Sequence, residues 1–287
     1  MSEQTRIDTA LAEAVSQLEK SSDSPRLDAE LLLMQALDVT RSYLIAHPED
    51  TLDDHSAARF HTLLKRRADG EPIAYISGVK EFWTLELMVS PATLVPRPET
   101  ELLVQLALNQ IPREGACSVV DLGTGSGAIA LSLATERPDC KVTATDASGD
   151  ALRVAMENAR QHDLVNVEFL EGSWFEPLGD RVFDIVVSNP PYVRDDDPAL
   201  AELRHEPITA LASGNDGLDA VRVLAEQAPK HTAPGGYLML EHGAEQQQDV
   251  ADILAASGWQ DVECHKDLAG LPRVTTARLD AGNAAGS

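Results

Sequence analysis

The sequence predicts an α/β fold, a Rossmann-like, doubly wound sheet of mostly parallel strands that follows a small all-helical domain. Two observations carry this prediction. After Pro112, short β-branched apolar runs alternate with amphipathic helical stretches, which is typical of a sheet covered by helices on both faces. Before Tyr75, apolar residues recur only at helical spacing, beginning with Ile7, Leu11 and Val15.

The N-terminal 75 residues are expected to form helices only. Ser24-Pro25 is typical of an N-cap followed by the first helical residue, and Gly70 is a suitable C-terminal stop. The basic cluster Lys65-Arg66-Arg67 would then lie at a helix C-terminus, where cations offset the helix dipole. The expected helices begin near Ile7 and at Pro25, and span 41–46 and 57–68. We predict that residues 1–75 form a small recognition or packing domain, because they carry no catalytic motif.

A linker is expected over residues 76–97. Residues 82–89 are rich in β-formers and are followed by Pro91, which favours a β-hairpin. Two prolines then flank Arg97, ahead of a helix over 101–109. A plain helix start accounts for Pro98 but not for an arginine between two prolines.

The second domain is predicted over residues 98–280. The expected strands are 119–122, 142–146, 167–170, 183–188, 236–241, 262–266 and 274–279, the last two as an antiparallel pair at the edge. The expected helices are 128–137, 151–160, 219–228 and 246–256. The small, polar residues 281–287 are expected to be a disordered tail.

Composition narrows the function classes. The 287 residues carry a formal net charge of −24, which disfavours binding to DNA or RNA because a nucleic-acid groove needs clustered Lys and Arg. No run approaches the roughly 18 apolar residues of a membrane span. The three cysteines Cys117, Cys140 and Cys264 offer neither a disulfide framework nor a CxxC metal pair, and the N-terminus lacks the apolar core of a signal peptide. We therefore expect a cytoplasmic protein.

A glycine-rich loop follows the first strand of the sheet, in Asp121-Leu122-Gly123-Thr124-Gly125-Ser126-Gly127. Its glycines permit a tight turn and close approach of the backbone to a ligand, and the helix that follows offers free N–H groups. The spacing is neither the dinucleotide fingerprint nor a P-loop. Asp146 ends the next strand, where an acid can bind both hydroxyls of a ribose, although it could also cap the following helix.

The motif Asn189-Pro190-Pro191-Tyr192 directly follows the strand expected at 183–188. The prolines end the strand, and ligands of such sheets bind beyond the carboxyl ends of the strands. The Asn189 side-chain oxygen and the Pro190 carbonyl can each accept one hydrogen of an NH2 group, and the Tyr192 ring can pack on a flat substrate. The motif therefore predicts an amide or exocyclic amine as substrate.

These motifs together resemble the HemK/PrmC family of class I methyltransferases. Besides the glycine loop and the Asn-Pro-Pro-Tyr motif, the resemblance rests on Gly-Glu-Pro-Ile-Ala-Tyr-Ile at 70–76, Glu-Phe-Trp at 81–83, Val-Pro-Arg-Pro-Glu-Thr-Glu at 95–101, Glu206-Pro207, Ala210-Leu211, Pro234-Gly235-Gly236 and Glu241. It extends from about residue 27 to residue 279. The family methylates the amide nitrogen (N5) of the glutamine in the Gly-Gly-Gln motif of class I peptide chain release factors.

The resemblance implies S-adenosylmethionine as cofactor and release factors as partners of residues 1–75. It assigns cofactor binding to Asp121, to the loop Gly123, Thr124, Gly125, Ser126 and Gly127, to Asp146, Trp174 and Asn189, and catalysis to Asn189, Pro190, Pro191 and Tyr192. Many relatives carry an acid where this chain has Ser173, so the contact to the adenine amino group is not assigned; Trp174 could also be a core residue. We expect a monomer that binds no metal, since His205, His231 and His242 lack metal-ligand spacing.

Two other functions remain open at this stage. The same Asn-Pro-Pro-Tyr motif would suit a nucleic-acid exocyclic-amine methyltransferase of the adenine N6 type, which the acidic charge disfavours. The other is a non-enzymatic adaptor with a vestigial cofactor site, which the intact Gly125 and Asn189 disfavour.

Overall fold

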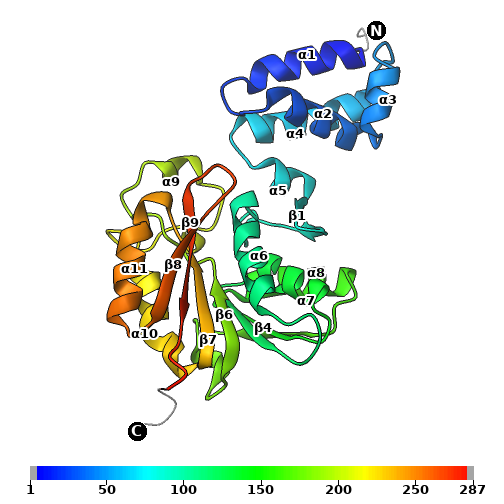
Figure 1. The fold of residues 1–287 in the computed structure, drawn as a ribbon. Coiled ribbons are helices and arrows are strands. Elements are labelled where there is room, and N and C mark those ends of the chain that lie inside the picture. Colours follow the sequence, from blue (N-terminus) through cyan, green and yellow to red (C-terminus); the bar gives the residue numbers. More distant parts are fainter. Residues whose placement is uncertain (1–4, 283–287) are drawn as a thin grey trace. The chain divides into compact units, whose positions relative to one another are not determined.

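The computed structural model describes residues 5–282 and contains two compact units, one ending at Val79 and one beginning at Lys80 (Figure 1). Most of the tail expected at 281–287 lies outside the described residues. No helix within the described range is both long and apolar enough to cross a membrane.

The first unit is helical, as predicted. Its helices are α1 (Ile7–Leu18), α2 (Pro25–Leu37), α3 (Arg41–Ala46), α4 (Asp54–Ala68) and α5 (Ile73–Ser77). Their apolar faces meet in one core that includes Leu18, Leu32 and Leu33, none of which is exposed. The basic end of α4 does more than offset the helix dipole, because Arg67 also pairs with the buried Asp28 at 2.6 Å. The short helix α5 was not predicted.

The expected hairpin is formed by β1 (Val79–Phe82) and β2 (Leu85–Met88), and all of it except Val79 belongs to the second unit. The tight turn places Trp83 in the left-handed region, with φ of 58°. The buried Asn158 side chain holds the end of β2 on both sides, since it accepts from the Met88 N–H at 2.7 Å and donates to the Met88 carbonyl at 3.0 Å.

The main sheet has seven strands in the order β5-β4-β3-β6-β7-β9-β8. They are β3 (Ser118–Leu122), β4 (Lys141–Asp146), β5 (Val167–Glu171), β6 (Phe183–Ser188), β7 (Thr232–Glu241), β8 (Gln260–Lys266) and β9 (Pro272–Arg278). The first five of these are parallel, and β9 runs antiparallel to both β7 and β8. The strand order reverses between β3 and β6, and the crevice beyond that point is where such sheets bind ligands.

Helices cover both faces of the sheet (Figure 1). They are α6 (Glu101–Gln110), α7 (Ala128–Glu136) and α8 (Gly149–Gln161), which contribute to one core cluster, and α10 (Asp219–Gln227) and α11 (Gln247–Ala256), which contribute to the other. Because β3 and β6 alternate their buried side chains between the two clusters, both strands are covered on either face.

One of the sheet predictions needs correction, and another is confirmed. β7 begins at Thr232, four residues before the expected start, although Pro234-Gly235-Gly236 is typical of a turn. Gly236 lies so close to β6 that a Cβ atom there would be 2.7 Å from the Asp184 carbonyl oxygen, so the strand continues where a larger residue would break it. The antiparallel pair predicted at the edge of the sheet is confirmed, with β8 outermost and β9 between β8 and β7.

Candidate active site

The glycine loop lies between β3 and α7, as predicted. Gly123, Gly125 and Gly127 all have positive φ, between 59° and 87°. A side chain at Gly127 would also collide with Leu131, whose nearest atom would be 2.9 Å from the added Cβ. At Gly125 an added Cβ would meet nothing within 4 Å, because this glycine faces the open space of a cavity.

Asp146 joins the glycine loop to the loop before α8. One carboxylate oxygen accepts from the Gly125 N–H at 2.9 Å and the other from the Ser148 N–H at 2.8 Å. Asp146 is therefore not the N-cap of α8; Ser148 is, since its hydroxyl accepts from the Ala151 N–H. Each Asp146 oxygen keeps lone pairs for a further donor, such as a ribose hydroxyl.

Asp121 lies beneath the loop, not at the surface of the cavity. It is completely buried, and one of its oxygens accepts from the Thr124 hydroxyl at 2.6 Å and from the Ala130 N–H at 3.2 Å. Its other oxygen has no hydrogen-bond partner among the described residues. Desolvation raises the pKa of Asp121 to about 7. Asp121 therefore supports the loop from below through its hydrogen bonds to Thr124 and Ala130.

Trp174 follows β5 and adopts left-handed backbone geometry, with φ of 48°. Its carbonyl accepts from the Thr145 hydroxyl at 3.1 Å, and its ring packs over Gly123, where an added Cβ would lie 3.4 Å from the ring. Trp174 and Ser173 both line the cavity, and Trp174 also contacts the core cluster on the α10 side of the sheet.

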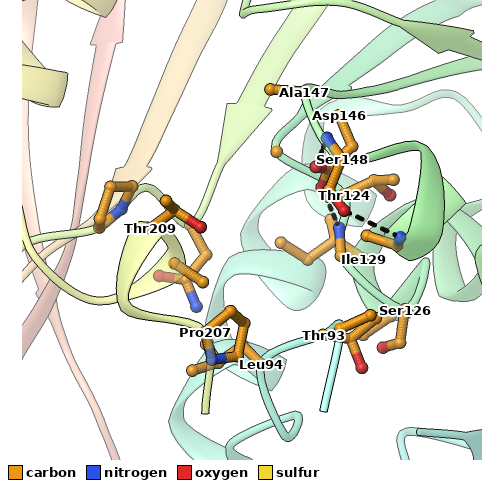
Figure 2. Close-up of a pocket in the computed structure, with 18 of the residues that line it drawn as sticks. Thr93, Leu94, Thr124, Ser126, Ile129, Asp146, Ala147, Ser148, Pro207 and Thr209 are labelled. Carbon is orange, nitrogen blue, oxygen red and sulfur yellow. Dashed lines mark hydrogen bonds between the residues drawn. The ribbon is translucent and has the colours of Figure 1, made fainter. Parts of the chain in front are cut away.

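These elements surround one cavity of about 500 Å³ at the carboxyl ends of β3, β4 and β6. Figure 2 shows two opposing walls, one carrying Thr124, Asp146 and Ser148 and the other carrying Pro207 and Thr209. The first wall consists of the glycine loop and the start of α8, and the second belongs to the segment after the Asn-Pro-Pro-Tyr motif. The cavity therefore spans both sequence motifs.

The Asn-Pro-Pro-Tyr motif contributes to the cavity in part. Asn189 and Pro191 line it, whereas Pro190 and Tyr192 do not. The Asn189 Nδ2 donates to the Thr100 hydroxyl at 3.2 Å, and its Oδ1 accepts no hydrogen bond from the described residues. The Tyr192 hydroxyl is directed at Glu241, 3.5 Å away, and the packing of its ring on a substrate stays a prediction.

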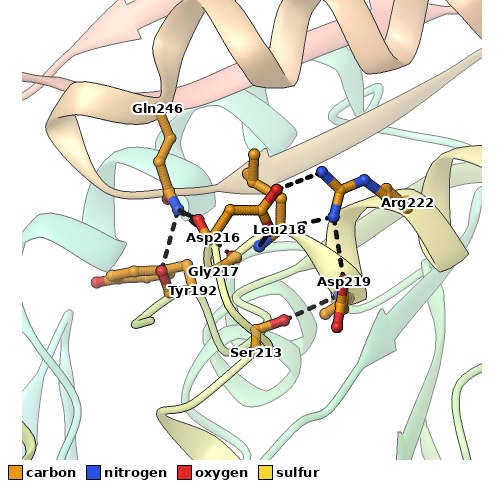
Figure 3. Close-up of polar contacts among 9 residues, drawn as sticks. Tyr192, Ser213, Asp216, Gly217, Leu218, Asp219, Arg222 and Gln246 are labelled. Atoms are coloured by element: carbon orange, nitrogen blue, oxygen red, sulfur yellow. Dashed lines mark hydrogen bonds and ion pairs between the residues drawn. The ribbon is translucent and has the colours of Figure 1, made fainter. Parts of the chain in front are cut away.

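The chain from Tyr192 onward is held in place by hydrogen bonds to its backbone carbonyls. Gln246 donates to the carbonyls of Tyr192 at 3.0 Å and of Asp216 and Gly217 at 3.4 Å, as Figure 3 shows. A Cβ at Gly217 would be 2.3 Å from the Tyr192 carbonyl oxygen, so only glycine fits. Val193 pairs with the segment around Ala212, and the residues between them form a loop that returns to the cavity.

The returning loop is anchored by Glu206, whose side chain is 2% exposed. Its carboxylate forms an ion pair with Arg97 and accepts from the Val95 N–H at 3.0 Å. This contact explains the arginine between two prolines: stiff backbone holds Arg97 at the cavity rim, where it fixes the opposite wall.

The predicted site residues are mostly assembled in one place. Around the cavity lie Gly123 to Ser126, Asp146, Trp174, Asn189 and Pro191, whereas Asp121, Gly127, Pro190 and Tyr192 lie behind its surface. Sequence reasoning missed Thr93, Leu94, Ser148 and Thr209, which also line the cavity. Their position next to a motif is the only sequence feature that could have indicated that these residues line the cavity.

Comparison with known proteins identifies both units of the chain and its fold. A family model described as the PrmC N-terminal domain matches residues 9–78, and a methyltransferase domain model matches residues 113–269. A methyltransferase from Pyrococcus furiosus shares the fold, with a TM-score of 0.54 and 20% identity over 78% of this chain and 99% of that one.

Two relatives are called release factor glutamine methyltransferase. The one from Salmonella typhimurium is 47% identical over 94% of this chain and 97% of its own length, and that from Xylella fastidiosa (strain Temecula1) is 49% identical over 88% and 93%. Identity of this level over nearly the full length establishes the family. The chain is an S-adenosylmethionine-dependent methyltransferase and belongs to the release factor glutamine methyltransferase family.

Proposed function

We propose that this chain methylates the side-chain amide nitrogen (N5) of the glutamine in the Gly-Gly-Gln motif of class I peptide chain release factors. One observation carries the proposal: Asn189 borders the cavity with its Nδ2 bonded to Thr100, and its Oδ1 has no hydrogen-bond partner among residues 5–282. That oxygen is available to accept a hydrogen of a substrate NH2 group. The relatives named release factor glutamine methyltransferase support this choice of substrate.

The cavity fits the cofactor. Gly125 leaves open space where any side chain would project, and the Asp146 carboxylate is fixed by two backbone N–H groups with lone pairs to spare for a ribose. The Trp174 ring beside Gly123 offers a flat apolar face for an adenine. S-adenosylmethionine, when bound there, supplies an electrophilic methyl group.

Asn189 and Pro190 orient the substrate nitrogen. A glutamine amide is a poor nucleophile because its nitrogen lone pair is delocalised into the carbonyl. The Asn189 Oδ1 borders the cavity and accepts one N–H of the substrate. We assign the second N–H to the Pro190 backbone carbonyl on the motif alone, because Pro190 itself lies behind the cavity surface. The two bonds would hold the nitrogen in one orientation and stabilise the positive charge that it gains. Transfer would form the nitrogen–methyl bond as the methyl–sulfur bond breaks and leaves a neutral thioether, and the nitrogen would release one of its two protons to water.

We assign recognition of the intact release factor to the helical unit, for which the match of residues 9–78 to the PrmC N-terminal domain is the support. The formal charge of −24 favours a protein partner over nucleic acid. We further propose that the enzyme acts as a monomer in the cytoplasm, where release factors work.

The test offers isotopically labelled S-adenosylmethionine with purified release factor, duplex DNA or ribosomal RNA in parallel reactions. We expect label in the release factor alone, with fragment mass spectrometry placing one methyl group on the glutamine of Gly-Gly-Gln. Label in either nucleic acid and none in the protein would overturn the proposal and favour an exocyclic amine substrate.

A further inference from the structure

A buried carboxylate lies directly behind Asn189. Glu241 is the last residue of β7, and Ser188, the last residue of β6, pairs with Leu240 of β7. Asn189 and Glu241 are therefore neighbours at the ends of adjacent parallel strands. Glu241 is 1% exposed, and its Oε2 has no hydrogen-bond partner among the described residues. Burying a carboxylate with an unpaired oxygen is costly, so a buried acid at a reaction site is expected to have a role there.

Thr100 connects the two residues. This buried threonine accepts from the Asn189 Nδ2 at 3.2 Å, and its hydroxyl also interacts with the Glu241 carboxylate, which it stabilises in the ionised form. Tyr192 approaches the same carboxylate from the other side, with its hydroxyl 3.5 Å from Oε1. The first and last residues of the Asn-Pro-Pro-Tyr motif thus share one anchor.

The protons on Thr100 determine which way the Asn189 amide faces. A threonine hydroxyl has one proton and a carboxylate can only accept, so in a hydrogen bond between the two Thr100 is the donor. The Thr100 oxygen is then left as an acceptor, which only the NH2 end of Asn189 can satisfy. The reversed amide would place its carbonyl oxygen against the Thr100 oxygen with no proton between them.

We propose that Glu241 is a positioning residue, which through Thr100 locks the Asn189 amide with Nδ2 inward and Oδ1 toward the substrate. The inference rests on the proposed function, in which Asn189 Oδ1 accepts from the glutamine NH2. The reversed amide would present a donor to that NH2 group and repel it.

The charge state of Glu241 sets the lock. Burial raises its pKa to about 7; the Thr100 contact, Arg273 and Tyr192 lower it, and Glu99 raises it. A protonated Glu241 can donate to Thr100, whose own proton is then free to bond the reversed Asn189 amide. The lock therefore strengthens as pH rises through about 7.

The experiment measures single-turnover methyl transfer to purified release factor by Glu241→Met, Thr100→Val and Thr100→Ser, with Glu263→Gln, an exposed acid on β8, as control. Glu241→Met keeps the length of the side chain without the carboxylate that accepts hydrogen bonds, and removing a buried charge need not lower the stability of the fold. We expect Glu241→Met and Thr100→Val to slow transfer by about tenfold or more while cofactor affinity stays within about twofold, and Thr100→Ser to retain the wild-type rate. In an Asn189→Ala background, Glu241→Met should cause no further loss.

Two further readouts separate positioning from mere structural support. The wild-type rate should rise with pH near 7, and this rise should shrink in Glu241→Met; Asp121, the other carboxyl with a pKa of about 7, is present in both proteins. With ¹⁵N labelling of asparagine, Glu241→Met should shift the Asn189 side-chain amide signals and leave those of the buried Asn158 unchanged.

Either of two results would overturn the inference: a wild-type rate in Glu241→Met, or a slowing that persists undiminished in the Asn189→Ala background. Failure of the proposed function looks different, because then the wild-type protein itself would not methylate the release factor.

Discussion

The carboxylate of Asp146 accepts the backbone N–H of Gly125 at 2.9 Å, so the end of β4 and the glycine loop are held as one surface. Asp146→Ala removes this bond and the acceptor proposed for the ribose. Loss of a charged hydrogen bond is worth roughly 1.5–3 kcal/mol, which is about ten- to a hundredfold in affinity. Calorimetric titration with S-adenosylmethionine measures it. The exposed Asp180 provides a matched control in Asp180→Ala, and equal affinities of the two variants would refute the assignment.

Glu206 is expected to maintain the wall opposite the glycine loop. Glu206→Ala leaves the Val95 N–H and Arg97 without their buried partner, so we expect the free energy of unfolding to fall by about 1–3 kcal/mol and the KM for release factor to rise. Urea unfolding and steady-state kinetics measure the two effects. The exposed Glu202 of the same loop is the control, and a Glu206→Ala enzyme that matches Glu202→Ala in both would show that the ion pair is dispensable.

Asp121 should make the fold pH-dependent. Its pKa is about 7 in the folded protein and near 3.8 in the unfolded chain, so the folded state binds its proton more tightly. The contribution of this group to stability is fully present below about pH 4 and is lost as pH rises through 7, by about 4 kcal/mol at most. Asp121→Asn cannot ionise and should therefore gain stability relative to wild type between pH 5 and pH 8.

Urea unfolding of both proteins at the two pH values checks the Asp121 prediction. A difference in unfolding free energy that stays constant with pH would mean that Asp121 titrates normally in the folded state.

The sequence predicted those features of the site that neighbouring residues determine, and it did not predict contacts between segments far apart in the chain. The glycine loop, Asp146 and Asn189 were placed correctly at the carboxyl ends of their strands, because local patterns determine strand ends and the strand order brings them together. The link from Asn189 through Thr100 to Glu241 joins three separate segments, and no local pattern encodes such a contact. The contact of the Tyr192 hydroxyl with Glu241 is of the same kind, and the packing of its ring on the substrate stays a prediction.

In the fold, too, features set by local patterns were predicted and features set by tertiary packing were not. Long periodic helices such as α4 and α8 were predicted nearly to their ends, whereas the five-residue α5 is too short for its periodicity to be recognised. The early start of β7 depends on the close packing of Gly236 against β6, which is a tertiary effect that overrides local turn preference.

The helical unit should matter only for intact partners. A chain that begins at Lys80 keeps both core clusters of the sheet, so we expect it to fold and to bind S-adenosylmethionine. It should lose most of its activity on full-length release factor, because docking is the role we assign to the missing helices. A short Gly-Gly-Gln peptide should be methylated equally by the long and short chains. Normal activity of the short chain on the full-length partner would contradict that role.

The most direct test of the account is single-turnover methyl transfer by Asn189 variants at saturating cofactor, with cofactor affinity measured separately. Asn189→Ala removes one acceptor for the substrate NH2, which costs about 1–3 kcal/mol in pairing plus the lost orientation, so we expect at least a roughly hundredfold fall in rate. Asn189→Asp keeps acceptor oxygens of the same reach but loses the donor to Thr100, so it should retain measurable activity at a rate below that of the wild type. Methylation of the release factor at the wild-type rate by both variants would contradict the claim that Asn189 orients the substrate nitrogen.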